Sequence, residues 1–507
     1  IQKLLRKCRR SWRTPANHPE QDPSMFRSIA LLSLALVHAT AAAERPNIVF
    51  ILADDMGYDS VSANNAAMGA LKTPSIDKLA TQSLNFSDAH SGSAVCTPTR
   101  YGFLTGRYCW RSRLKSSVLW DYGNPLIEED RLTLPQFLSD NGYRTGMIGK
   151  WHLGLAWHDS EGKHANSVLS DGDAVFRNEK MKEKIFAVEA SIDFNKPIGG
   201  GPLDRGFDEW SGVDLPNMAP YGWINDRQFE GVPSERKPKE MFGHDGAMTP
   251  GWKLEEILPR IGRESAEWIT EKAANDQPFF LYVSLTSPHS PIVPSGDWLG
   301  KSNLSIYADF LMETDAVVGQ IVDAVDKAGV AKNTIIVFTA DNGTANFARF
   351  NELEKQGVDL KHHFRGQKAQ IYEGGHRVPF IVRWPQKAPA GAHCDEVICL
   401  NDFFATTAAI LGKKLPENAA EDSTSILPLM TGEVTSIPDR PLVVNHDIGG
   451  RFAIRKGPWK LCQLKTPALY HLGKDPKETT NLADQHPEIV KELSETLAQY
   501  KASGRSR

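Results

Sequence analysis

Five short, unbroken runs of apolar and β-branched residues constrain the fold of this chain more than any other feature. They span residues 47–55, 143–152, 278–291, 334–343 and 378–385. Strands that are apolar on both faces are typical of a parallel sheet covered by helices on each side. Helical segments alternate with these runs, and in one of them Thr73 and Pro74 form a suitable helix start. We therefore predict an α/β fold with a large mixed, mostly parallel sheet sandwiched by helices.

The N-terminal segment of the chain differs in character from the rest. Residues 1–24 do not begin with methionine and are basic, then polar, so we interpret them as a mis-set start. Residues 25–43 combine a basic start, an apolar run and small residues, which is typical of a signal peptide. We therefore expect an exported protein, periplasmic or secreted. We expect no stable membrane insertion, because no run reaches ~18 uninterrupted apolar residues.

The remaining chain divides into a large domain and a small one. Residues 44–435 contain the apolar runs and are predicted to form the catalytic domain. Residues 436–507 contain short alternating strands and a polar helix, which predict a small C-terminal antiparallel sheet with a terminal helix. Residues 155–260 are polar and rich in Gly, Pro and Trp, so we interpret them as a long insertion over the catalytic face that selects substrate.

Charge and cysteine usage exclude several classes of protein. The 507 residues carry a formal net charge of −4, so we expect no nucleic-acid partner. Six cysteines are too few for a disulfide scaffold, and their spacing matches no zinc pattern. Cys394 and Cys399 are close enough in sequence to pair, whereas Cys109 is predicted to be a packed thiol.

Ionisable and amide side chains follow four of the predicted strands, where ligands bind in open α/β sheets. Taken singly, each could be a capping or loop residue, but four together indicate a site. An oxygen-only set, three carboxylates and one amide, suits Ca²⁺ or Mg²⁺. The candidate metal ligands are Asp54, Asp55, Asp341 and Asn342, and the other polar residues at the strand ends are Lys150, His152 and His289.

The segment "SAVCTPTRYGFLTGR", residues 93–107, places a cysteine where a helix is expected to begin. Thr97 is an acceptable N-cap, and Pro98 suits the first turn. Cys96 would then lie at a helix N-terminus, which favours negative charge, with Arg100 one turn further on. Cys96 is therefore a candidate nucleophile, although a buried packing cysteine is the alternative. A tetrahedral phosphate or sulfate ester would be surrounded by the basic side chains of Arg100, Lys150, His152, His289 and Lys368.

The sequence around Cys96 resembles the C-x-P-x-R motif of the type I, formylglycine-dependent sulfatases. The segments "GKWHLG", "SPHSP", "FTADNG", "FRGQKAQIYEGGHRVP" and "LYHLGKDPKETTNLA" are similar to other blocks of that family, in the same order. The resemblance extends from Pro46 to about Ala498 and is closest to enzymes similar to arylsulfatase A and N-acetylgalactosamine-6-sulfatase. It implies an alkaline-phosphatase-like fold and a sulfatase acting on sulfated carbohydrates.

The resemblance also implies a role for each candidate residue. A maturation enzyme would oxidise Cys96 to Cα-formylglycine, whose hydrated form attacks sulfur. Asp54, Asp55, Asp341 and Asn342 would bind Ca²⁺, which also touches residue 96. The resemblance implies that Arg100 and Lys150 hold the hydrated aldehyde, that His289 and Lys368 bind the sulfate, and that His152 accepts a proton.

Two other functions remain open at this point. A phosphonate or phosphate-ester hydrolase of the same superfamily would use the same metal cage, and a non-catalytic binding protein could be built on the same fold. Neighbouring residues have structural interpretations: Glu373 and Arg377 are expected to form bonds around the site. His362 and His363 are interpreted as solvated loop residues, and no role is assigned to His158, His164 or His244.

Overall fold

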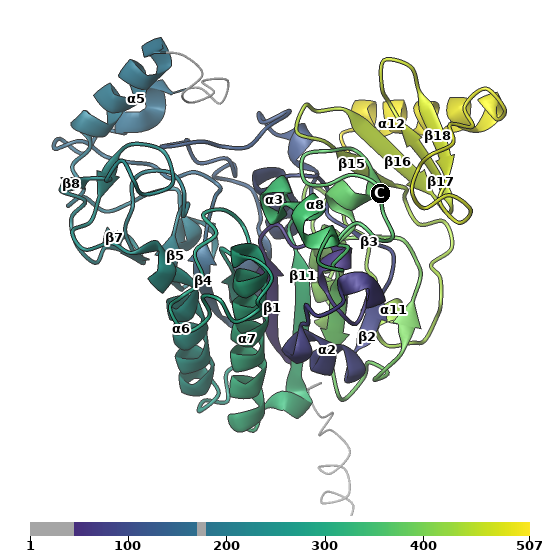
Figure 1. Cartoon of the computed structure of the whole chain (residues 1–507), viewed down its shortest axis with the longest axis horizontal. Coiled ribbons are helices and arrows are strands. Elements are labelled where there is room, and N and C mark those ends of the chain that lie inside the picture. Colours follow the sequence, from purple (N-terminus) through teal and green to yellow (C-terminus); the bar gives the residue numbers. More distant parts are fainter. Residues whose placement is uncertain (1–44, 170–178) are drawn as a thin grey trace, which may run out of the picture. The chain divides into compact units, whose positions relative to one another are not determined.

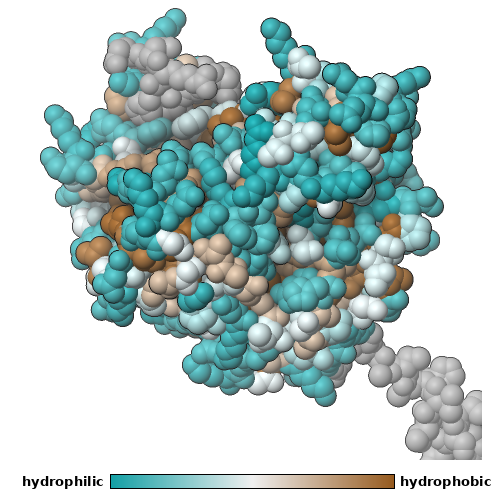
Figure 2. Space-filling model, turned by 45° about the vertical axis from the view of Figure 1, so that its right-hand side comes forward, coloured by the Kyte–Doolittle hydropathy of each residue, from teal (hydrophilic) through white to brown (hydrophobic). Residues whose placement is uncertain are grey.

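The computed structural model describes residues 45–169 and 179–507, and these form one compact unit. The predicted mis-set start at 1–24 and signal peptide at 25–43 lie outside the described residues, as do residues 170–178. Within the described ranges, no helix combines the length and the apolar character needed to cross a bilayer. The face seen in Figure 2 is largely hydrophilic, with hydrophobic residues in small groups among the hydrophilic ones.

A ten-stranded mixed sheet forms the centre of the molecule, as the apolar runs predicted. Its five central strands are mutually parallel, because β11, β1, β10, β4 and β5 pair in parallel in that order. β12 pairs antiparallel with β11 and with β2, and β6 and β7 continue the other edge as antiparallel strands. In spatial order the strands are β13 (His393–Cys394), β2 (Leu84–Phe86), β12 (Phe380–Arg383), β11 (Thr334–Ala340), β1 (Asn47–Ala53), β10 (Phe279–Ser284), β4 (Arg144–Lys150), β5 (Glu209–Val213), β6 (Ile224–Asn225) and β7 (Gln228–Phe229).

Helices cover both faces of this sheet, as the continuous apolar strands require. In Figure 1, α2, α6 and α7 stand in front of the sheet, and α6 and α7 lie side by side. The helices are α2 (Pro74–Thr81), α3 (Cys96–Thr105), α4 (Leu134–Asp140), α5 (Glu179–Ser191), α6 (Ile257–Lys272), α7 (Ile306–Lys327), α8 (Phe350–Glu354), α9 (Glu373–His376), α10 (Asp402–Ile410), α11 (Leu427–Met430) and α12 (Pro487–Ser503).

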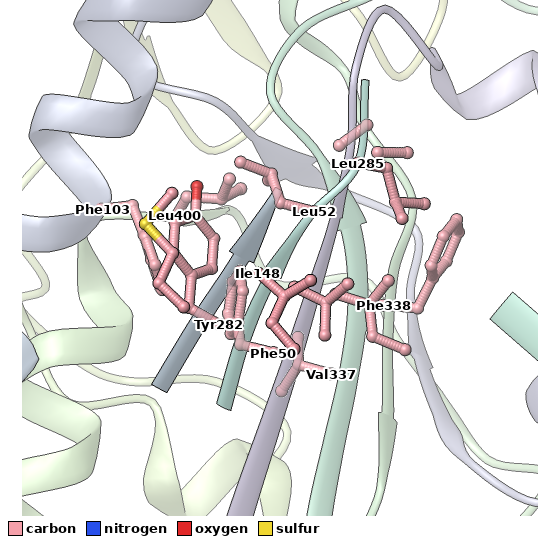
Figure 3. Close-up of a cluster of buried hydrophobic side chains, with 14 of the residues drawn as sticks. Phe50, Leu52, Phe103, Ile148, Tyr282, Leu285, Val337, Phe338 and Leu400 are labelled. Carbon is pink, nitrogen blue, oxygen red and sulfur yellow. The ribbon is translucent and has the colours of Figure 1, made fainter. Parts of the chain in front are cut away.

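The core between the sheet and helix α3 contains aromatic rings among aliphatic side chains (Figure 3). Phe50 on β1 stacks on Phe103 of α3, with ring centroids 4.1 Å apart, and its ring lies 4.9 Å from that of Phe403 on α10. Tyr282 on β10 contacts the same Phe103 ring at 5.1 Å. These rings are buried, so the helix that begins at Cys96 is held rigidly on the sheet.

The C-terminal segment forms the predicted antiparallel sheet and terminal helix, visible in yellow in Figure 1. Its strands pair in sequence order: β15 (Val443–His446), β16 (Phe452–Lys456), β17 (Trp459–Cys462) and β18 (Ala468–His471). Helix α12 packs on this sheet through Leu493 and Leu497, which are fully buried with Val444 and Ile454.

Two expectations need correction. The segment 155–260 is not wholly an insertion, because its β5 extends the central sheet in parallel with β4; two short strands, β8 (Glu235–Arg236) and β9 (Ala247–Met248), form a separate pair. Cys394 and Cys399 are both free thiols. Cys394 lies on β13 of the central sheet, whereas Cys399 lies on β14 (Ile398–Cys399), which pairs instead with β3 (Ala89–His90), so the two cysteines belong to different sheets.

Candidate active site

The carboxyl ends of β1 and β11 bring the four candidate metal ligands together. Asp54 and Asp55 follow β1, and Asp341 and Asn342 follow its neighbour β11; all four are buried. The backbone N–H of Asp55 donates to Asp341 Oδ1 at 3.1 Å, and Asn342 Nδ2 donates to Asp55 Oδ1 at 2.8 Å. The next residue is Gly343, where an added Cβ would lie 1.8 Å from the carbonyl oxygen of Gly374, so this turn requires glycine.

Cys96 is the first residue of α3, so the helix begins two positions earlier than a cap at Thr97 predicts. The N-cap is Val95, in extended conformation, and it makes no side-chain cap. The Thr97 hydroxyl, predicted to be the cap, instead accepts the N–H of Leu119 at 3.2 Å, so a tertiary contact replaces the local one. The buried thiol lies 3.6 Å from Asp54 Oδ1.

Two fully buried cations form ion pairs with the aspartates. Lys150, at the end of β4, donates to Asp54 Oδ2 at 2.6 Å. Arg100, on the first turns of α3, pairs with Asp341 Oδ2 at 2.8 Å and approaches Asp54 Oδ2 at 3.6 Å. The Arg100 guanidinium also donates to the Ser284 hydroxyl, which fixes its orientation.

Lys368 and His289 flank the other side of the cluster. Lys368 Nζ lies 2.7 Å from Asp55 Oδ1 and 3.4 Å from the Cys96 sulfur, so it bridges the carboxylate and the thiol. His289 follows β10; its Nε2 lies 3.8 Å from Asp55 Oδ2, and its Nδ1 is 2.5 Å from the Ser290 carbonyl oxygen. This backbone contact makes Nδ1 the donor and directs Nε2 toward Asp55.

His152 follows Lys150 after the end of β4, in the left-handed backbone region with a φ of 55°. Its Nε2 lies 3.0 Å from the Leu119 carbonyl oxygen and therefore carries the proton. Its buried Nδ1 has no hydrogen-bond partner in the described part of the chain. The His152 backbone N–H donates to Asp214 Oδ1 at 3.1 Å, which holds the loop in place. His152 thus offers an acceptor nitrogen.

Burial and the cluster of charges shift the pKa values of the acidic groups in opposite directions. Burial alone raises the pKa of Asp54, but Lys150, His289 and Arg100 outweigh it and hold this pKa well below its ordinary value. Burial, with the neighbouring charge of Asp54, raises the pKa of Asp341 to about 7. Crowded carboxylates of this kind are stabilised by a shared cation.

The histidines are kept neutral by the same environment. Burial, and then the charge of Lys368, lowers the pKa of His289 to about 4. Burial, and then Lys150, holds the pKa of His152 well below its ordinary value. Both rings can therefore accept a proton or a hydrogen bond at neutral pH.

Two buried oxygen atoms of the cluster lack hydrogen-bond partners within residues 45–169 and 179–507, and this bears on whether the cluster fits a metal ion. Asp55 Oδ2 and Asn342 Oδ1 have no hydrogen-bond partner among the described residues. An orphaned buried oxygen is costly unless a cation or water satisfies it. Ligand atoms of Asp54, Asp55, Cys96 and His289 also lie within 4.8 Å of one another. The oxygen donors fit a hard divalent ion such as Ca²⁺, with Mg²⁺ as the smaller alternative.

A cavity of about 460 Å³ opens over this cluster. Cys96, His152, His289 and Lys368 line it, whereas Arg100 and Lys150 are fully buried. His244, to which the sequence assigned no role, also lines the cavity, because a loop of the 155–260 segment folds over the site. His362 and His363 instead face Asp359 and Asp59 on partly exposed loops. Glu373 and Arg377 pair with each other, as expected.

Comparison with known proteins decides the family. Residues 46–413 match the family model described as Sulfatase, and residues 362–503 match one described as N-sulphoglucosamine sulphohydrolase, C-terminal. The chain belongs to the sulfatase family. It is therefore a sulfuric ester hydrolase, in agreement with the resemblance of the segment around Cys96. This excludes the interpretation as a non-catalytic binding protein.

Curated relatives of this sulfatase cover nearly its whole length. An N-acetylgalactosamine-6-O-sulfatase of Bacteroides thetaiotaomicron is 32% identical, over 90% of this chain and 93% of the relative. Arylsulfatase A of Bos taurus is 29% identical, over 93% of this chain and 90% of the relative.

Solved structures share the fold of this sulfatase. A protein from work on metabolism of multiple glycosaminoglycans by Bacteroides thetaiotaomicron has a TM-score of 0.77 at 29% identity, covering 91% of this chain and 100% of the other. A phosphonate monoester hydrolase of Agrobacterium radiobacter, at 19% identity and a TM-score of 0.57, covers 91% and 96% of the two chains and shares the fold alone. The alkaline-phosphatase-like α/β architecture is thus confirmed.

Proposed function

We propose that this chain hydrolyses sulfate esters of carbohydrates, using Ca²⁺ at the aspartate cluster and a Cα-formylglycine made from Cys96 by a maturation enzyme. The two oxygens of Asp55 and Asn342 that lack a hydrogen-bond partner in the part of the chain that the structure describes carry the proposal, because they call for a cation, and ligand atoms of Asp55 and Cys96 lie within 4.8 Å of each other. The similarity to an N-acetylgalactosamine-6-O-sulfatase favours a sulfated sugar as substrate. Export to the periplasm or exterior remains part of this proposal.

Asp54, Asp55, Asp341 and Asn342 would hold the metal. Bound Ca²⁺ would supply positive charge to the sulfate oxygens, and the hydrated aldehyde at position 96 would supply the attacking oxygen. The chain's own residues prepare this chemistry. Lys150 keeps Asp54 ionised, and Arg100 orients Asp341 through their ion pair, so that the carboxylates would face the metal position.

The residues that line the cavity act on the substrate. Lys368, at 3.4 Å from the sulfur atom of residue 96, binds a sulfate oxygen next to the nucleophile. His289 presents Nε2 from the same side. Because Nδ1 carries the proton of the neutral ring, Nε2 would first take up a proton from solvent and then donate it to the bridging oxygen as that oxygen leaves. His152 accepts a proton at Nδ1, because Nε2 already donates to Leu119. Removing one such stabilising donor typically costs ~10²–10³ in rate.

The state of residue 96 is the first test. The protein is coexpressed with and without a maturation enzyme, and the peptide containing residue 96 is examined by mass spectrometry. We expect aldehyde only after coexpression, with sulfate-ester turnover rising in parallel. Cys96→Ala should abolish turnover while leaving the melting temperature unchanged, and Cys109→Ala, a change at another buried cysteine, should retain turnover. An unmodified thiol in an active enzyme would refute the proposal.

Substrate class is tested by assaying sulfate, phosphate and phosphonate monoesters of the same alcohol side by side. The metal cage accommodates any of these tetrahedral anions, so geometry alone does not separate them. We expect the highest kcat/KM for the sulfate ester. A strong preference for the phosphate or phosphonate ester would instead support the second candidate function, a phosphoester hydrolase of the same superfamily.

A further inference from the structure

Exposed apolar side chains gather at the mouth of the cavity above Cys96. Phe242, Phe347 and Ile448 are 46%, 53% and 40% exposed, and all three line this cavity. They come from three separate parts of the chain: the 155–260 segment, the loop after β11, and the turn between β15 and β16. Contiguous exposed apolar groups around a cavity are typical of a ligand site rather than of ordinary surface.

The aromatic rings of this mouth are arranged in two pairs. The Phe242 and Phe347 rings lie 6.2 Å apart with an interplanar angle of 85°, and the Trp120 and His244 rings are stacked 5.9 Å apart at 10°. Because Phe242 and His244 are two residues apart in one loop, that loop joins the two pairs. We call Trp120, Phe242, His244 and Phe347 the aromatic mouth.

Polar groups lie among these rings at fixed positions. His244 Nδ1 lies 2.6 Å from Oδ2 of Asp121, a buried carboxylate whose other oxygen accepts the N–H of Ala219 at 3.1 Å. This bond sets the orientation of the His244 ring. Asn217, which also lines the cavity, has a buried Oδ1 without a hydrogen-bond partner among the described residues. An orphaned acceptor is matched by a ligand hydroxyl or amide N–H.

The wall carries little charge beyond the sulfate end. Among the described residues that line the cavity there is no Asp, Glu or Arg, and the one Lys is Lys368, already engaged with Asp55 and the Cys96 sulfur. A second sulfate or a carboxylate entering the mouth would lose hydration without gaining a counter-charge, which is costly. The mouth therefore favours an uncharged group.

We propose that the aromatic mouth binds one neutral sugar ring, the ring that carries the scissile sulfate, and selects it by shape and hydroxyl pattern. The inference rests on the proposed function. The apolar face of the sugar packs on Phe242 and Phe347, while its hydroxyl or acetamido groups bond to His244 and Asn217. Alternating aromatic and hydrogen-bonding groups fit a sugar, which has an apolar face and a polar edge, better than a wholly apolar ring. Asp121 is a positioning residue that acts through His244.

The stacking contacts are tested with Phe242→Ala and Phe347→Ala in the mature enzyme. For a 6-sulfated N-acetylgalactosamine we expect KM to rise about tenfold in each variant, the size of one lost aromatic contact, with kcat changed by less than about twofold. Inhibition by inorganic sulfate should be unchanged. Leu299→Ala, at an exposed residue that does not line the cavity, is the matched control and should leave KM unaltered. Unchanged KM in both Phe variants would overturn the inference.

Recognition of the hydroxyl pattern is tested with His244→Ala and Asp121→Asn. The wild type should prefer one of the 6-sulfated galacto and gluco epimers, measured as the ratio of their kcat/KM values. In both variants this ratio should fall by at least about fivefold. Loss of overall activity with the ratio retained would overturn the assignment. The same comparison with a sulfated sugar bearing a carboxylate should show weaker binding to the wild type; equal binding would also overturn it.

Binding of the desulfated sugar separates this inference from the proposed function, because it requires no turnover. Titration calorimetry should detect N-acetylgalactosamine binding to the wild type and weaker binding to Phe347→Ala. If the mature wild type released no sulfate from any ester, the proposed function would fail. Calorimetry would still show whether the aromatic mouth binds the sugar. If it released sulfate but neither variant altered sugar binding, the mouth alone would fail.

Discussion

At the scale of single residues, the centre of the site is a group of like charges held together by opposite ones. Asp54, Asp55 and Asp341 are all buried, and Lys150, Arg100 and Lys368 each pair with at least one of them. Burying carboxylates is costly unless each is paired, and the oxygen of Asp55 that lacks a hydrogen-bond partner among the described residues is where the proposed metal ion would bind. Metal binding should therefore contribute directly to the stability of the fold.

Removal of the proposed metal ion should destabilise the fold. We expect EDTA to lower the melting temperature of the Cys96→Ala protein, and added Ca²⁺ to restore it, because that variant keeps the carboxylates but carries out no chemistry. At a Ca²⁺ concentration 100 times the Kd, stabilisation should be about 2.7 kcal/mol. Asn342→Ala should reduce the Ca²⁺-dependent rise in melting temperature, whereas Asn195→Ala, at an exposed position, should not. An identical melt in a demonstrably metal-free sample would contradict the prediction.

The site residues at strand ends were predictable from the sequence, whereas those on distant loops were not. Asp54, Lys150 and Asp341 were predictable, because parallel strands deliver their carboxyl ends to one edge. His244 gave no such signal, since its position over Cys96 depends on how a loop more than 100 residues away folds back. The Asp121 contact that orients it joins residues 123 positions apart in sequence, a distance that no local pattern encodes.

At the scale of elements, β3 and α9 are joined by two buried histidines. His90 Nδ1 and His376 Nδ1 lie 2.9 Å apart, so one ring must donate while the other accepts. Burial lowers the pKa of both rings, and Lys460 adds to this effect at His376. Protonating both rings would place two positive charges in contact, so this junction is sensitive to acid.

Acid sensitivity is the prediction at this scale. The folded pKa values lie below the unfolded value of about 6.5, so the unfolded chain binds more protons as pH falls and stability decreases from pH 7 to 5. His376→Gln should reduce this loss by about 2 kcal/mol, measured as the free energy of unfolding in urea at both pH values. His393→Gln, at an exposed histidine, is the control. An equal loss in wild type and His376→Gln would disprove the assignment.

At the scale of the whole molecule, buried ion pairs connect the C-terminal sheet to the main α/β domain. Lys460 on β17 contacts Glu373 Oε1 of α9 at 3.0 Å and Glu478 Oε1 at 2.8 Å, and all three side chains are fully buried. Arg455 on β16 adds a contact to Glu373 Oε2 at 3.3 Å. The two parts on either side of the boundary predicted near residue 436 are therefore not electrostatically independent. The buried carboxylate of Glu373 is neutralised by cations of the C-terminal segment.

The substitution Lys460→Met removes the buried positive charge that joins the two parts of the chain. It leaves Glu373 and Glu478 buried with too little positive charge, so we expect it to lower the free energy of unfolding by about 3–5 kcal/mol in chemical denaturation. Lys456→Met, on the preceding strand β16, removes a half-exposed pair with Glu492 and should change stability by less than about 1 kcal/mol. Similar small effects of both substitutions would show that the buried pairs do not join the two parts.

Five strands of the central sheet, their alternation with helices and the polar residues at strand ends were predictable from the sequence, because hydrophobic periodicity and strand-end chemistry are local properties of the chain. The sequence also revealed the family resemblance, because the motifs around Cys96 and Asp341 are contiguous. Tertiary structure alone decided the helix start at Cys96, the two free cysteines on separate sheets, and the aromatic mouth. Each of these depends on contacts between segments far apart in sequence, which form only when burial of the common core brings those segments together.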